Sequence, residues 1–141
     1  MSEFFLEIKK ATFKASEKNK VVNFSLNIKN EGEIICLLGP SGIGKTTILR
    51  SIAGLQKIND GEIYLDGSLI SSKKTHLEPE KRNIALSFQD NSLFPHYNVI
   101  DNINFGSKRN NNSKYNISLN QLINLLHLQG LEKKYPHQIS A

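Results

Sequence analysis

A glycine-rich loop, set between an apolar run and an amphipathic segment, constrains this 141-residue chain more than any other feature. The apolar run covers residues 34–38 and is unbroken, which is typical of a strand buried on both faces of a parallel sheet. After the loop, apolar residues recur at helical spacing from Ile48 to Ala53, and Gly54 is suited to end a helix. The order strand, loop, helix therefore predicts an α/β fold.

The loop itself, residues 39–46, follows the pattern G-x-x-x-x-G-K-[ST] and is called the phosphate loop below. Its glycines let the backbone form a concave nest of N–H groups, and the positive end of the following helix adds to the field there. Lys45 can reach the β- and γ-phosphates, the Thr46 hydroxyl can ligate Mg²⁺, and Thr47 can donate toward the α-phosphate. We predict a nucleoside triphosphate and Mg²⁺ bound by Gly39, Pro40, Ser41, Gly42, Ile43, Gly44, Lys45, Thr46 and Thr47. A chance match is disfavoured because the strand and the helix that the motif requires flank it.

The front of the chain predicts further strands. Residues 4–13 are rich in strand formers but alternate imperfectly, and residues 24–28 alternate as a half-buried strand does. Asp66 and Gly67 lie between two short apolar runs and predict a hairpin, although Asp66 could also end a strand as a metal-holding carboxylate. Residues 84–88 form a second candidate buried strand.

The back of the chain predicts helices. Residues 99–105 suit a short helix, and residues 108–114 predict an exposed linker. Ser118 and Gln121 form a capping box for a helix that Gly130 would close. We expect one domain over residues 1–141, with a β-rich core in residues 1–90 and a smaller helical part in residues 91–141.

Composition limits the class of partner. The net charge of +5 comes from dispersed basic residues without interleaved aromatic residues, so we expect no nucleic-acid partner. No apolar run is long enough to span a membrane, and the amino terminus lacks the pattern of a signal peptide, so we expect a cytoplasmic location. Cys36 lies in the predicted buried strand and is expected to be a small core residue.

Three segments carry a resemblance to a known family. Residues 38–50 read LGPSGIGKTTILR, residues 79–96 read PEKRNIALSFQDNSLFPH, and residues 135–140 read YPHQIS. In this order they resemble the phosphate loop, the Q-loop region and the approach to the signature motif of ATP-binding-cassette (ABC) transporter ATPases. Within that family the chain looks most like importers of iron, polyamines or sulfate. The resemblance implies a P-loop NTPase core with an antiparallel β subdomain and the start of a helical subdomain.

The resemblance also implies roles for single residues. Lys45 and Gln89 would be catalytic, and Gln89 would join Thr46 at the Mg²⁺ of bound ATP while linking the site to a transmembrane partner. Phe13 is the candidate for stacking on adenine, with a place in the strand core as the open alternative. The implied partners are permease subunits and a second ATPase subunit, and the implied location is peripheral, on the inner face of the cell membrane.

The family pattern breaks off inside the signature motif, at Ser140 and Ala141. We therefore expect the amino-terminal portion of such an ATPase, truncated before the Walker B strand and without the catalytic Glu and the switch His. Two other functions stay open. One is a nucleotide-binding module without turnover, and the other is a soluble ABC protein unconnected with transport.

Overall fold

The computed structural model describes residues 3–14, 20–88, 92–105 and 117–139. The chain forms two compact units, residues 1–86 and residues 87–141. Neither unit contains a described helix that is long and apolar enough to cross a membrane.

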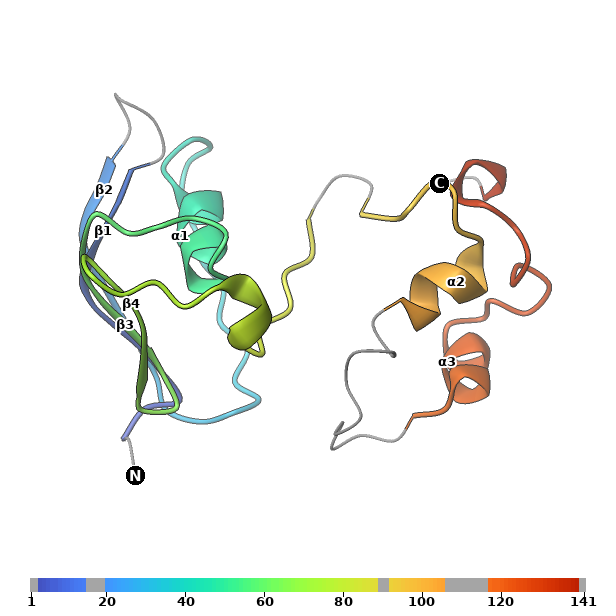
Figure 1. Ribbon diagram of the computed structural model, residues 1–141, viewed down its shortest axis with the longest axis horizontal. Helices are drawn as coiled ribbons and strands as arrows, with labels where there is room; N and C mark the ends of the chain where they lie inside the picture. Colours follow the sequence, from blue (N-terminus) through green and yellow to red (C-terminus); the bar gives the residue numbers. More distant parts are fainter. Residues whose placement is uncertain (1–2, 15–19, 89–91, 106–116, 140–141) are drawn as a thin grey trace. The chain divides into compact units, whose positions relative to one another are not determined.

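The first unit is built on a four-stranded antiparallel sheet with the strand order β2-β1-β3-β4 (Figure 1). The strands predicted in residues 4–13 and 24–28 and the hairpin are confirmed. Asp66 and Gly67 have φ angles of 46° and 73°, the two positive values that a tight hairpin turn needs. The strands are β1 (Leu6–Lys14), β2 (Lys20–Ile28), β3 (Asp60–Leu65) and β4 (Ser68–Ser72).

A bulge in β1 explains its imperfect alternation. Lys10 has a φ of 45°, and the register of β1 shifts between Ile8 and Ala11 against β2. The extra residue returns Ala11 and Phe13 to the face that already carries Leu6 and Ile8. All four side chains are therefore buried on one side of the sheet.

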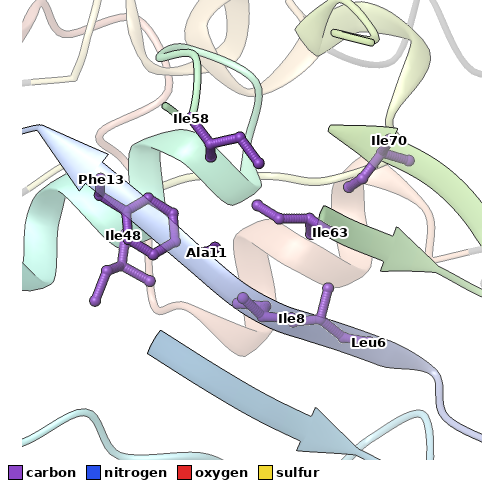
Figure 2. Close-up of a cluster of buried hydrophobic side chains, with 8 residues drawn as sticks. All are labelled: Leu6, Ile8, Ala11, Phe13, Ile48, Ile58, Ile63 and Ile70. Atoms are coloured by element: carbon purple, nitrogen blue, oxygen red, sulfur yellow. The ribbon is translucent and has the colours of Figure 1, made fainter. Parts of the chain in front are cut away.

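Helix α1 (Lys45–Ile52) lies on that same side of the sheet (Figure 1). Figure 2 shows its Ile48 next to Phe13 of β1, within the cluster of apolar side chains that forms the core. Ile58, Ile63 and Ile70 complete the cluster from the other elements of the unit. The core thus holds α1 against β1, and with it the start of the helix that follows the phosphate loop.

The two predicted buried strands are wrong for this structure. Residues 34–38 and 84–88 form no strand, and Ile34 and Leu38 are 94% and 89% exposed. Cys36 is also exposed, which corrects the expectation of a core cysteine. A strand buried on both faces needs neighbours within its sheet, and no strand among the described residues pairs with either segment. The local sequence has the apolar character of a central strand, but the part of the chain that the structure describes contains no strand that pairs with it.

The second unit contains α2 (Val99–Asn104), α3 (Leu119–Leu125) and the short 3₁₀ turn η3 (Pro136–Gln138); a similar turn, η1 (Pro79–Lys81), belongs to the first unit. The predicted helices and the capping box of Ser118 and Gln121 are confirmed. The predicted linker, residues 108–114, lies outside the described residues.

The expected end of α3 at Gly130 is wrong. The helix ends at Leu125 because His127 takes a left-handed φ of 53°. His127 N donates to Asn124 O and Leu128 N donates to Ile123 O, which is the Schellman pattern of helix ends. The sequence pattern did not predict this helix end, because a histidine occupies the position where glycine is most common.

Candidate nucleotide-phosphate site

The phosphate loop enters α1 through Gly44, the residue that precedes the first helical turn. Gly44 has a φ of 110°, in the region that L side chains rarely adopt. A Cβ atom at this position would also lie 2.5 Å from Cγ2 of Val21. Strand β2 and the loop therefore approach each other so closely that only glycine fits.

The start of α1 offers N–H groups that have no protein acceptor. No side chain caps the helix, and its first turn contains no acidic residue. The first-turn N–H groups of Lys45, Thr46 and Thr47 consequently have no hydrogen-bond partner among the described residues. Uncapped donors at the positive end of a helix dipole form a site for an anion, and phosphate is the anion that such ends bind most often.

The ammonium group of Lys45 is held against the loop backbone. Its Nζ donates to the carbonyl oxygens of Gly39 and Pro40, at 2.6 and 2.7 Å. Thr46 and Thr47 lie in the first turn of α1, Thr46 exposed and Thr47 half-buried. The predicted loop residues 39–47 thus lead into the uncapped start of α1, and glycines at positions 39, 42 and 44 take positive φ angles of 157°, 80° and 110° along the loop.

The opposite end of α1 is anchored by Arg82, a residue that sequence reasoning missed. The guanidinium, on a side chain 1% exposed, donates to the carbonyl oxygens of Ser51 and Ile52 at the negative end of the helix dipole, at 2.9 and 3.0 Å. It also donates to Leu77 O at 2.6 Å and to Ser71 Oγ at 2.9 Å. Burial lowers the pKa of Arg82 from its ordinary value, since desolvation penalises the charge.

Two neighbours complete the contact around Arg82. A Cβ atom at Gly54, where φ is 83°, would lie 2.5 Å from Arg82 Nε, so the guanidinium lies directly against a bare backbone. His76 Nε2 lies 3.1 Å from Gly54 O and its Nδ1 lies 3.3 Å from Arg82 Nη2. An arginine in a polar loop carries no local signal of burial, because all its partners except Leu77 and His76 are at least eleven residues away.

The structure describes only one of the two remaining predicted site residues, Phe13 and Gln89. Phe13 is fully buried, with its ring 6.1 Å from that of Phe24 and its side chain in the core, so the structure favours the strand-core alternative over stacking on adenine. Gln89 lies outside the described residues, and its predicted role is not tested by the structure.

A groove of about 820 Å³ lies elsewhere on the first unit. Residues of β1, β2 and β3 and the turn after β4 line it, among them Glu7, Lys9, Glu62 and Lys74. None of its lining residues belongs to the phosphate loop or to α1. Its charges are of both signs, so it shows no preference for a polyanion.

Known proteins are similar to this chain in sequence and in fold. Relatives with curated names include a Fe(3+) ions import ATP-binding protein of Pectobacterium atrosepticum, 36% identical over 139 residues that make up 97% of this chain and 38% of that protein. A putrescine transport ATP-binding protein of Escherichia coli is 40% identical over 138 residues, 96% of this chain and 35% of that protein. The chain therefore spans little more than a third of these relatives.

Solved structures agree on the fold. The structure of cbiO1 of Clostridium perfringens, part of the ABC transporter complex cbiONQ, aligns with a TM-score of 0.71 at 23% identity, covering 99% of this chain and 57% of that one. A nucleotide-free ATP-binding cassette aligns with a TM-score of 0.71 at 21% identity, covering 97% of this chain and 59% of that one. The family model described as ABC transporter matches residues 21–141. The chain belongs to the ABC transporter family, and its fold is that of an ATP-binding cassette.

Proposed function

We propose that the chain binds Mg²⁺-ATP at the phosphate loop as the nucleotide-binding part of the ATPase subunit of an importer. The observation that carries the proposal is the uncapped start of α1. Three free N–H groups there, and the ammonium of Lys45 held close to them, make a cradle for a triphosphate.

Each residue of the cradle has a separate task. The backbone of residues 39–44 surrounds the β-phosphate, and Lys45 compensates the charge of the β- and γ-phosphates. The Thr46 hydroxyl is a hard oxygen ligand suited to Mg²⁺, and Thr47 donates toward the α-phosphate. Gln89, by resemblance, adds a contact to the metal and to the attacking water.

Transport requires partners outside this chain. We propose that permease subunits in the membrane and a second ATPase subunit complete the machine, with this chain at the cytoplasmic face. Support comes from the names of the relatives, which are import or transport ATP-binding proteins. ATP bound between two ATPase subunits would close them, and hydrolysis would reopen them. This opening and closing would switch the permease between two conformations.

Nucleotide binding is tested by titrating the full chain with Mg²⁺-ATP in a calorimeter. Lys45→Ala removes a charge that contacts the phosphates and should weaken binding by roughly tenfold to a hundredfold. Lys57→Ala, an exposed lysine outside the loop, is the matched control and should bind as the unmodified chain does. Equal affinity in all three proteins would refute the proposed site.

Turnover is a separate measurement. The chain spans 57% and 59% of the two cassettes named above, and none of its segments resembles the Walker B strand, the catalytic Glu or the switch His of the family. We expect the chain by itself to bind Mg²⁺-ATP with little release of phosphate. Rapid phosphate release that Lys45→Ala abolishes would show instead that residues 1–141 suffice for hydrolysis.

A further inference from the structure

The buried guanidinium of Arg82 uses all of its donors. An arginine side chain has five N–H groups and no acceptor. Four of these groups donate to oxygens of the first unit, namely Leu77 O, Ser51 O, Ile52 O and Ser71 Oγ. The fifth donates to a ring nitrogen, His76 Nδ1, which lies 3.3 Å from Nη2. His76 is therefore the acceptor that completes the hydrogen bonds of a charge that is almost fully buried.

The contact with Arg82 decides which ring nitrogen of His76 carries a hydrogen. A guanidinium only donates, so Nδ1 has to offer a lone pair, and the single hydrogen of the neutral imidazole is then on Nε2. Nε2 lies 3.1 Å from Gly54 O and donates to it. Both ring nitrogens are thus used, one by Arg82 and the other by the residue that follows the C-cap of α1.

Backbone pairing places His76 beside Arg82. The segment after β4 turns back along the strand, and Leu77 N donates to Ile70 O at 3.0 Å. His76 consequently lies opposite Ser71 in an antiparallel bridge. Side chains of directly opposed residues lie on the same face, and on this face the buried Ser71 hydroxyl accepts from the guanidinium.

Helix α1 is short, so a displacement of one end is carried to the other. Its eight residues make about two turns, roughly 12 Å in length. Arg82 holds the carboxyl end directly, and His76 holds it through Gly54. The amino end is the uncapped helix start of the phosphate site. A binding site keeps its geometry only where the surrounding contacts hold the elements that carry it.

We infer that His76 is a positioning residue for nucleotide binding. Its neutral imidazole, with the hydrogen on Nε2, orients Arg82 and joins the carboxyl end of α1 to the segment that follows β4. The position of the helix start, and of the triphosphate bound there, depends on this contact. The effect on nucleotide rests on the proposed function, whereas the hydrogen position on His76 and its contact with Arg82 do not.

The hydrogen position is tested by ¹⁵N NMR of the full chain labelled at histidine. The signals of His76 are assigned by their absence in His76→Gln. At neutral pH we expect a protonated Nε2 and an unprotonated Nδ1. A hydrogen on Nδ1, or two nitrogen shifts averaged as in a free imidazole, would overturn the inference.

Two substitutions separate the hydrogen bonds of His76 from the space that its ring fills. His76→Phe keeps a ring and removes both nitrogens, whereas His76→Gln keeps an acceptor and a donor group. The Nε–H of Arg82 should exchange with solvent about tenfold faster or more in His76→Phe, and should stay within about threefold of its original rate in His76→Gln. The amide of Asn59, bonded to Thr12 O, should remain protected in both variants and shows that the unit is folded.

Nucleotide binding by the same variants is measured by calorimetry with Mg²⁺-ATP. His76→Phe should weaken binding by roughly threefold to tenfold, and His76→Gln should stay within about twofold of the unmodified chain. His137→Phe makes the same change at an exposed histidine of the second unit, and it should bind as the unmodified chain does.

Each outcome has a distinct meaning. Unchanged exchange at Arg82 in His76→Phe would overturn the contact of His76 with the guanidinium. Equal losses of affinity in His76→Phe and His76→Gln would overturn the role of the hydrogen bonds, because the ring would then matter only for the space it fills. Faster exchange at Arg82 with undiminished affinity in His76→Phe would overturn the link between His76 and the phosphate site.

The unmodified chain provides the remaining control. If it did not bind Mg²⁺-ATP, the proposed function would be refuted, and the role of His76 in nucleotide binding with it. The NMR and exchange measurements would still decide whether His76 holds Arg82, so the two failures are told apart.

Discussion

At the scale of single residues, Arg82 makes the most consequential contact in the first unit. Its guanidinium satisfies the carbonyl oxygens of Ser51 and Ile52 where helix α1 ends. Ser51 O also accepts from Gly54 N at 3.2 Å, but no other donor among the described residues reaches Ile52 O, so removing the guanidinium costs both carbonyls a charged donor. Arg82 therefore stabilises the helix whose other end holds the predicted phosphate site.

The substitution Arg82→Met keeps much of the side-chain volume and removes every donor. We expect it to lower the free energy of unfolding by about 2–4 kcal/mol, measured by urea denaturation. Lys81→Met changes an exposed neighbouring charge and should alter stability by less than about 0.5 kcal/mol. Similar denaturation midpoints for the two variants would mean that the buried guanidinium makes no net contribution to the free energy of unfolding.

Tyr64 gives a prediction about pH. Its hydroxyl donates to Glu62 Oε2 at 2.9 Å, and this bond, followed by desolvation and the Glu62 charge, raises the pKa of Tyr64 above its ordinary value of 10.0. Because the folded-state pKa is the higher one, the stabilisation is complete below pH 10.0 and is lost as the pH rises through the folded-state value.

Glu62→Gln should lower the pKa of Tyr64 toward 10.0, since the carboxylate charge is gone. Tyrosinate absorbance against pH measures it, and the other three of the four tyrosines give a common background in both proteins. Glu31→Gln, at an exposed turn, is the control and should leave the titration curve in place. A Glu62→Gln curve that overlays the original would contradict the hydrogen bond.

At the scale of elements, the correct predictions are those that depend on residues only a few positions apart in the sequence. The capping box of Ser118 and Gln121 and the hairpin at Asp66 and Gly67 depend on contacts inside one turn of chain. The bulge at Lys10 and the helix end at His127 were not predicted, because both place an ordinary side chain at a positive φ. Such positions are set by packing, not by propensity.

The entry to α1 predicts the effect of Gly44→Ala. The backbone there has a φ of 110°, and the added methyl group would meet Val21 at 2.5 Å. We expect a loss of about 1–3 kcal/mol of stability and weaker Mg²⁺-ATP binding, measured by thermal unfolding and calorimetry. The matched control is Gly32→Ala, with a φ of 89° and nothing within 4 Å, which shares the backbone strain without the clash.

If Gly32→Ala lowers the stability as much as Gly44→Ala and both variants bind nucleotide equally, the close approach of β2 to the phosphate loop contributes neither to stability nor to nucleotide binding. A larger loss at Gly44 alone would locate the constraint at the contact with Val21.

At the scale of the whole molecule, the apolar segment of residues 34–38 stands out because all of it except Leu37, which packs against the core, is exposed. Ile34 and Leu38 are almost fully exposed, and the segment has no pairing strand. Exposed apolar side chains beside unpaired backbone groups favour association with another chain.

We expect the isolated chain to self-associate as its concentration rises and Ile34→Lys to suppress this association, as measured by sedimentation velocity. Stability should change little, because Ile34 makes no core contact. Leu69→Lys, at a less exposed apolar residue of β4, is the control and should leave association unchanged. Equal association in all three proteins would mean that the chains do not associate through residues 34–38.

By itself, the sequence determined the phosphate loop, the helix after it, the hairpin and the caps, because local chemistry over a few neighbouring residues encodes each of them. Tertiary structure alone decided that Arg82 anchors α1, since its partners Ser51 and Ile52 lie about thirty residues away and are chosen by how the chain folds back. It also decided that Phe13 lies in the core and that residues 34–38 pair with no described strand. An apolar run states only that a segment can be buried; whether it becomes a strand depends on the neighbours that tertiary structure supplies.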